Sequence, residues 1–257
     1  MRWRHIPVRA RRTRALRLAS LACVAWLGSG AHAARAQSLA SERPRIPEPM
    51  VFDLLRPLGA RAGEREVNVL AVRPLRAGAP TGWAPELEYA YAPGQSLEIE
   101  FPFADDRLVA YKAALQGTFG IGANGRFIHG WQVITLYDRE VARTETSLLY
   151  IAGYRFGPRW SVLGIAGIEK AGLKAAGPTT LLVNPSLFYE IDPLTVVGVE
   201  VNLRRGLSLD DTTRCLIIPQ IQRRLTETTT LQIGLGAQVE TGRDPGLVAA
   251  MRLIRDF

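Results

Sequence analysis

Apolar and polar residues alternate along most of the chain, in stretches of roughly nine to thirteen residues. In the segment 231–240 every odd position is apolar and every even position is Gln, Gly or Glu, and the segments 197–204 and 97–103 alternate in the same way. Successive side chains of a β-strand point to opposite faces, so this period predicts strands with one apolar face. We predict twelve strands, at about 64–73, 84–92, 95–103, 107–119, 127–137, 144–156, 159–169, 179–191, 194–204, 212–224, 229–240 and 246–257.

The length of these strands separates two all-β folds. Strands of soluble sandwiches usually have about five or six residues, whereas a tilted strand needs about nine to eleven to cross a bilayer. The pattern therefore predicts an antiparallel, up-and-down transmembrane β-barrel, and an exported soluble β-sandwich is the rival fold. An even number of strands is usual for single-chain bacterial barrels and places both termini at one end, which we expect to be periplasmic.

The predicted connections are of two lengths. Counting back from the C-terminus, the connections 170–178, 206–211 and 241–245 fall outside the cell, and the tight turns at Asp192-Pro193 and Gly157-Pro158 fall on the periplasmic side. Long outer loops and short periplasmic turns are typical of outer-membrane barrels. The connections 104–106 and 120–126 fit this asymmetry less well.

One hairpin allows a register prediction. The four glutamates at 86, 88, 98 and 100 share one face only if the residues around Ala92-Pro93-Gly94 pair in an odd register. A three-residue loop with Gly94 in the left-handed conformation provides this register.

The net charge of +8 is concentrated at the N-terminus. Eight arginines and no acid lie in the first 36 residues, and the remaining 24 basic residues equal the 24 acidic ones in number. The body of the chain is therefore neutral, which argues against nucleic acid as a partner. The leader itself has an Arg-rich start, an apolar stretch from Leu16 to Leu27 and small residues ending in Ala34-Arg35-Ala36, which predicts a cleavable signal peptide.

These features divide the chain into three parts. Residues 1–36 form the predicted signal peptide, with Ala31-His32-Ala33 as a second possible cleavage site. Residues 37–63 contain four prolines and are predicted to be an extended periplasmic arm or a plug, with a flexible leader favoured. Residues 64–257 form the predicted barrel.

In a barrel, the apolar face of each strand contacts lipid and the polar face lines the lumen. An Arg turned toward lipid at the bilayer midplane would cost about 2–4 kcal/mol, so the charges are predicted to point inward. The expected lumen-lining residues are Glu86, Glu88, Glu98, Glu100, Lys112, Glu200, Arg204, Arg214 and Arg224. Aromatic residues near strand ends are expected to form interfacial girdles; they are Tyr89, Tyr91, Phe103, Trp131, Tyr154, Phe156, Trp160, Tyr189 and Phe257.

The sequence shows little catalytic chemistry. After cleavage one histidine remains, His129, and a Ser-His hydrolase would need a neighbouring strand to bring Ser147 close to it. Cys215 is left as the single cysteine and is interpreted as a wall residue. The glycines at 117, 120 and 122 are not followed by Lys-Ser/Thr, so they form no phosphate-binding loop. We expect no enzyme, no cofactor and no metal site.

Together, the leader, the alternating strands, the tight turns and the terminal Phe257 resemble Gram-negative outer-membrane β-barrels. The Glu86–Tyr91 segment is also similar to porin-like transport barrels encoded with genes for phenol degradation by the meta pathway. The resemblance implies two partners, outer-membrane lipid and the barrel-assembly machinery, which would read the last strand ending at Phe257. Arg255 departs from the apolar pattern there and is expected to reach toward the interface.

Three functions remain open at this stage. The first is a porin-like channel that passes small solutes through a charged lumen. The second is a non-transporting structural or assembly barrel whose lumen is closed by ion pairs and by the arm. The third is an outer-membrane lipid hydrolase that depends on His129.

Overall fold

The structure is a computed structural model that describes residues 43–257 except 53, 123, 173–176 and 208–211. The predicted signal peptide lies outside these residues. Among the residues described, none belongs to a helix long and apolar enough to cross a membrane. The strands are β1 (Arg65–Pro74), β2 (Gly82–Ala92), β3 (Gln95–Glu100), β4 (Phe103–Ala104), β5 (Arg107–Leu108), β6 (Ala110–Gly122), β7 (Phe127–Asp138), β8 (Arg143–Arg155), β9 (Trp160–Ala171), β10 (Thr179–Asp192), β11 (Thr195–Gly206), β12 (Thr213–Thr226), β13 (Thr229–Glu240) and β14 (Arg243–Asp256).

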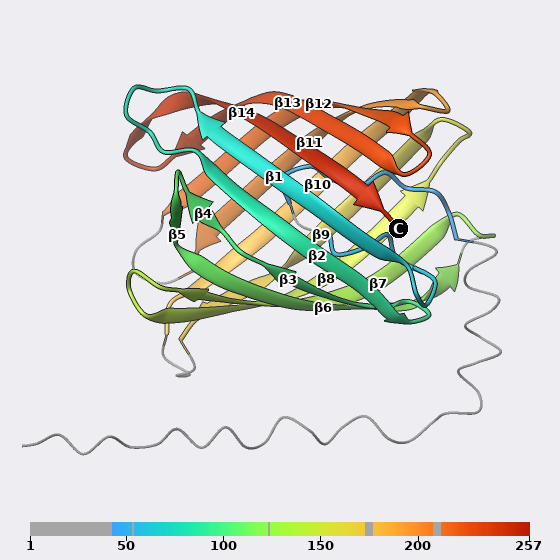
Figure 1. Cartoon of the computed structure of the whole chain (residues 1–257), viewed down its shortest axis with the longest axis horizontal. Helices are drawn as coiled ribbons and strands as arrows, with labels where there is room; N and C mark the ends of the chain where they lie inside the picture. The colour runs from blue at the N-terminus through green and yellow to red at the C-terminus, as the bar shows by residue number, and fades with distance from the viewer. Residues whose placement is uncertain (1–42, 53, 123, 173–176, 208–211) are drawn as a thin grey trace, which may run out of the picture.

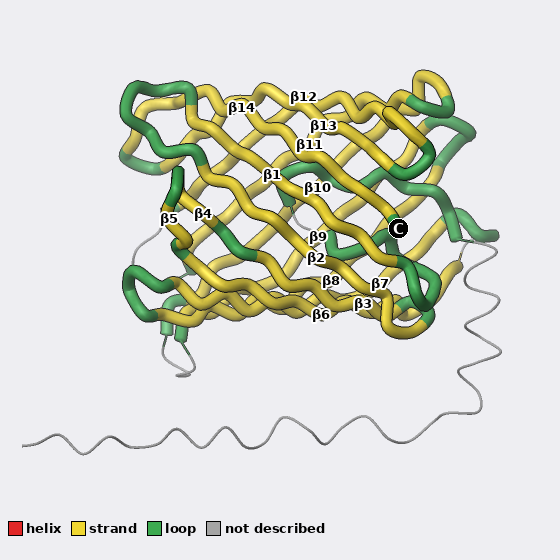
Figure 2. Tube along the Cα trace, in the orientation of Figure 1, coloured by secondary structure: helices red, strands yellow, loops and turns green. Residues whose placement is uncertain are grey.

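These strands form one closed antiparallel barrel (Figures 1 and 2). Sequential strands pair with each other, and β1 pairs with both β2 and β14, which closes the sheet. The short β4 and β5 pair with each other and continue the β3–β6 hairpin, so they add no separate wall strand. The barrel therefore has twelve wall strands, and the predicted fold class and strand number are confirmed.

The two ends of the barrel differ. Phe257, the start of β1 and the 93–94 turn lie at one end, called here the proximal end, and the loop 75–81 lies at the opposite, distal end (Figure 1). Proximal connections such as 193–194 and 227–228 have two residues, whereas the distal loop 75–81 is longer. The predicted distal loop 241–245 is wrong, because Gly242 adopts a φ of 75° and a tight turn lets β14 begin at Arg243.

The hairpin between β2 and β3 has the predicted register. Glu86 pairs with Glu100 and Glu88 with Glu98, so these four side chains share one face. Gly94 adopts a φ of 70°, which a residue with a Cβ rarely does, and the register shifts between Ala90 and Ala92. The bulge next to the turn provides the odd register that the sequence demanded.

The outer surface of the wall is apolar, as the alternation predicts. Its exposed aliphatic side chains come from every part of the barrel and include Leu87, Ile99, Leu148, Ile217, Leu235 and Leu253. At the proximal rim, the rings of Tyr154, Phe156, Trp160 and Tyr189 follow one another at centroid distances of 4.7–6.5 Å. A continuous apolar belt with aromatic rings at its edge matches the surface that a bilayer requires.

The described residues of the segment 43–63 are called the arm below, and the middle part of the arm lies inside the barrel. The arm enters at the proximal end and runs between the front and back walls (Figure 1, blue). Its Met50 and Leu55 are fully buried, and Leu54 and Leu58 are nearly so. The favoured prediction of a flexible leader is therefore wrong for these residues, because the arm and the inner face of the wall together form a core inside the barrel.

Candidate functional site

The interior of the barrel has a charged side, formed by β1, β2, β3, β6 and β14. Arg252 is 1% exposed, and its guanidinium lies 3.4 Å from carboxylate oxygens of both Glu86 and Glu88 and 3.9 Å from Glu66. It also donates to the side-chain oxygen of Asn68 at 3.1 Å. One buried cation thus joins three carboxylates from two strands across the β14–β1 seam.

A second cation completes this network. Lys112 of β6 forms ion pairs with Glu98, at 3.0 Å, and with Glu100. Oxygens of Glu86, Glu88 and Glu98 lie within 4.8 Å of one another, a spacing that suits a metal ion, but Arg252 and Lys112 already bring positive charge to these carboxylates. The acidic cluster is therefore a part of the ion-paired wall.

Glu200 of β11 fixes the arm by its backbone. Its carboxylate is fully buried and accepts the backbone N–H groups of Met50, Val51 and Phe52 at 2.8, 3.0 and 2.6 Å. Asn202 and Gln220 donate to the same carboxylate. Hydrogen bonds to a charged acceptor are the strong ones, at about 1.5–3 kcal/mol each, so Glu200 is the principal polar anchor of the arm.

Arg56 fixes the arm by its side chain. Its guanidinium is nearly buried and pairs with Glu66 of β1, with Asp256 of β14 at 3.0 Å and with Glu64 at 3.4 Å. Its backbone oxygen accepts a hydrogen bond from Gln116 of β6 at 2.6 Å. The arm is thus held on both sides of the lumen, by Glu200 and by the β14–β1 seam.

The side of the lumen opposite the acids is apolar. Inward residues of β7 to β11 form an apolar cluster with Leu54 and Leu58 of the arm, and Ile46 and Phe52 pack against it. The wall members of this cluster are Ile128, Leu149, Ile151, Leu163, Ile165, Leu182, Phe188 and Val196. The expectation that each strand turns its polar face to the lumen is therefore wrong for the middle of β7 to β10, where inward aliphatic side chains pack against the arm.

One wall glycine makes room for the arm. A Cβ at the inward Gly153 of β8 would collide with the end of the Ile46 side chain, and its other neighbours, Ile128 and Leu163, are at 3.4 Å. A glycine at position 153 is therefore required mainly because the arm packs there, and not because of the neighbouring wall residues.

The distal half of the lumen carries further ion pairs. Arg204 of β11 pairs with Glu169 of β9, and Arg214 of β12 pairs with Glu240 of β13 at 3.2 Å. The side chains of both arginines are nearly half exposed, at 43% and 48%. These charges line a wetter region than the buried network around Arg252.

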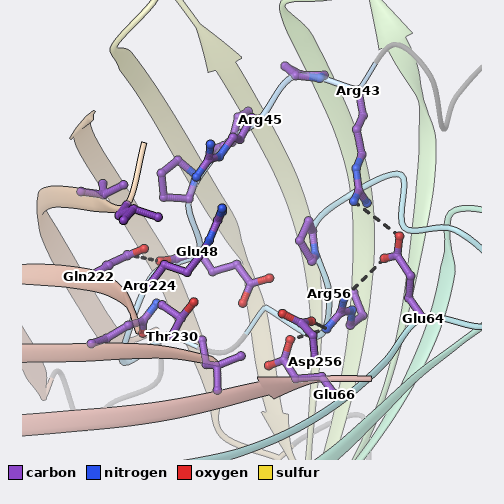
Figure 3. A pocket seen from close by; sticks show the side chains of 18 of the residues that line it. Arg43, Arg45, Glu48, Arg56, Glu64, Glu66, Gln222, Arg224, Thr230 and Asp256 are labelled. Carbon is purple, nitrogen blue, oxygen red and sulfur yellow. Dashed lines mark hydrogen bonds and ion pairs between the residues drawn. The ribbon is translucent and has the colours of Figure 1, made fainter. Parts of the chain in front are cut away.

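The proximal end opens into a cavity of about 590 Å³ between the arm and the wall (Figure 3). Arg224, predicted to line the lumen, faces this cavity together with Arg45 of the arm. Glu48 also lines it, and burial raises the pKa of Glu48 to about 8, with the charge of Glu66 acting in the same direction and the charge of Arg252 opposing it. Glu48 is therefore largely protonated at neutral pH.

The structure separates the residues of the hydrolase hypothesis. Ser147 points into the barrel and donates to Glu169 at 3.4 Å, whereas His129 lies on the outer face among Phe119, Phe127 and Tyr150. The two side chains are on opposite sides of the wall, so they cannot form a Ser-His pair. Cys215 lies within β12, as a wall residue.

Two features escaped the sequence reasoning. Arg252 was not among the predicted lumen residues, because the signal of the terminal strand lies in its outward apolar positions, whereas Arg252 is on the inward face. The apolar inner wall had a readable signal, since Leu148-Leu149-Tyr150-Ile151 is apolar at both parities, as strands buried on both faces are. Arg255 lies on the outer face, donates to Thr229 at 2.9 Å and stacks over the Phe257 ring.

Comparison with known proteins places the fold. A family model described as HAEPLYID-like matches residues 45–119, which span the arm and the strands up to β6. No curated protein matches the chain. Among solved structures, an outer membrane channel from Pseudomonas putida F1 aligns with a TM-score of 0.59 at 16% identity, over 82% of this chain and 100% of that one. The KdgM porin aligns with a TM-score of 0.56 at 9% identity (75% and 99%), and the NanC porin with 0.58 at 10% (73% and 97%). The chain therefore has the fold of outer-membrane porins.

Proposed function

We propose that this protein is a porin-like channel of the bacterial outer membrane, with an interior closed by the arm in the state seen here. The observation that carries the proposal is that the barrel interior is occupied by a segment separate from the wall strands, the arm, whose backbone continues directly into β1. Removal of that segment would leave a continuous lumen lined by charge on one side and by aliphatic residues on the other.

Several features support this location and orientation. The apolar belt with its aromatic rim suits a bilayer, and the predicted signal peptide would deliver the chain to the periplasm. In this proposal the proximal end faces the periplasm, where the arm enters and where the assembly machinery would meet the strand that ends at Phe257. The resemblance to barrels encoded with phenol-degradation genes stays a prediction, and it names no solute.

Conductance in planar bilayers tests the proposal. The mature chain is expected to conduct rarely, and a variant lacking residues 37–63 is expected to give steady single-channel currents, because the wall alone does not fill the lumen. A variant lacking only residues 37–42 is the matched control, since it keeps every described arm contact. Heat-modifiable migration on gels verifies that each variant has folded as a barrel.

A non-transporting structural barrel is the second candidate. The ion pairs of Arg252 and Lys112 favour it, because they cover one side of the lumen without help from the arm. If the folded variant without residues 37–63 stays silent, this second function replaces the channel.

A further inference from the structure

The proximal cavity has two unlike halves. In Figure 3 the side chains of Arg43, Arg56, Glu64, Glu66 and Asp256 gather on one side, and those of Arg45, Arg224, Gln222 and Thr230 on the other. In the first half both cations are already paired, since Arg56 pairs with all three acids and Arg43 pairs with Glu64 at 3.5 Å. This half therefore offers no unpaired cation to an anionic ligand.

The second half holds two guanidinium groups without a carboxylate. Among the described residues, Arg224 has no side-chain partner, and Arg45 reaches only the backbone oxygen of Pro193, at 3.5 Å. In Figure 3 both side chains extend into the same opening. Two cations that share an open space repel each other unless an anion lies between them, and guanidinium matches the planar geometry of a carboxylate.

Further groups complete the site. Gln232 is 1% exposed and lines the cavity with a side-chain oxygen that has no partner among the described residues. This oxygen can accept a hydrogen bond from a polar group on the body of a solute, but not from its carboxylate. Glu48 also lines the cavity, but the charges that act most strongly on its carboxyl group come from Glu66, Asp256, Arg56 and Arg252, and not from Arg45 or Arg224. The cavity is also lined by apolar side chains, Ile46, Leu194, Val196 and Ile254, which would contact the body of a solute.

We propose that the half of the proximal cavity formed by Arg45 and Arg224 binds small organic carboxylates with an apolar body. This inference rests on the proposed channel and assigns its solute class. The carboxylate lies between the two guanidinium groups, and the apolar part of the solute packs on the aliphatic lining. A cavity of about 590 Å³ is within the usual range for small-molecule sites.

Three nearly isosteric probes test the charge requirement. Benzoate, benzamide and benzamidine carry one negative charge, no charge and one positive charge on the same ring. Isothermal titration of the full mature chain in detergent, at pH 7 and low salt, is expected to give measurable binding of benzoate, binding of benzamide at least about tenfold weaker, and no binding of benzamidine.

Substitutions locate the site. Arg224→Gln is expected to weaken benzoate binding by about ten- to hundredfold, the usual loss for a charge-assisted hydrogen bond, and Arg45→Gln by a similar factor. Arg224→Lys is expected to keep part of the affinity. Arg223→Gln is the matched control. Arg223 directly precedes Arg224 in β12 but faces away from the cavity, and on that outer face it pairs with Asp192 at 3.6 Å.

The outcomes are decisive in both directions. Equal affinity for the three probes, no binding of benzoate, or benzoate binding unchanged by both Arg224→Gln and Arg45→Gln would overturn the assignment. Binding is measured without any current, so its failure is distinct from failure of the channel. If the variant lacking residues 37–63 conducts but the full mature chain binds no benzoate, only this site is refuted and the proposed channel stands.

Discussion

Replacement of Glu200 by Gln is the sharpest test of how the arm is held. One oxygen of the Glu200 carboxylate accepts from Met50 and Val51, and the other accepts from Phe52 and from the side chain of Asn202. In the Gln variant one of these oxygens becomes an NH2 group. Asn202 can turn its free side-chain oxygen toward that NH2, but the N–H of Phe52 cannot change its role.

The cost follows from this count. A buried N–H without an acceptor costs about 1–3 kcal/mol, and the two hydrogen bonds to the arm that remain, from Met50 and Val51, lose the assistance of the negative charge. A working figure of about 2 kcal/mol raises the ratio of undocked to docked arm about thirtyfold. Burial of Met50, Leu54, Leu55 and Leu58, at about 1.5–3 kcal/mol each, still favours docking, so the arm is loosened rather than lost.

Maleimide labelling measures this change. Leu55→Cys, on a Cys215→Ser background, places a thiol at a position that is fully buried while the arm is docked. When labelling is limited by the undocked population, Glu200→Gln should accelerate it about thirtyfold. Glu169→Gln is the control, because Glu169 is a lumen glutamate that pairs with Arg204 and accepts from Ser147, which both belong to the wall. Equal labelling rates with Glu200, with Glu200→Gln and with Glu169→Gln would refute the anchor.

Three further predictions concern the same interior. Gly153→Ala should speed the labelling of Leu55→Cys by pressing on Ile46, and a rate equal to that of the parent would show that the arm adapts without cost. Arg252→Met leaves its buried carboxylates without their cation and should lower stability to urea by about 3–5 kcal/mol, measured by the loss of heat-modifiable migration. Docking of the arm should weaken as pH rises from 5 toward 8: the docked pKa of Glu48 is about 8 against 4.5 when solvated, so docking needs proton uptake in this window. Labelling rates at several pH values measure this, and Glu48→Gln should flatten the profile.

The wall could be predicted from sequence because the fold of a membrane barrel imposes one rule on every strand. Whatever the interior contains, every second side chain of a wall strand points outward and must be apolar. The alternation of apolar and polar residues therefore located all twelve wall strands, and it also predicted the register around Gly94. The ends of strands were less certain. The turn at Gly242 depends on one left-handed residue, which alternation does not report.

The interior could not be predicted in the same way. Contacts across the lumen join segments far apart in the chain, as Glu200 meets Met50, and no local period records such a meeting. The prolines of the arm indicated an extended segment but not its place. Lumen charges were located by parity, whereas their partners, above all Arg252, depend on which strands face each other once the barrel has closed.

The direct junction between the arm and β1 has a consequence for kinetics. The arm ends at residue 63 and β1 begins at Arg65, so an undocked arm stays within a few nanometres of its place in the lumen. Docking is therefore a unimolecular step, and the fraction of closed barrels does not change with protein concentration. A separate peptide with the sequence of residues 43–63 would compete with an effective concentration in the millimolar range, so it should act well only on barrels that lack their own arm.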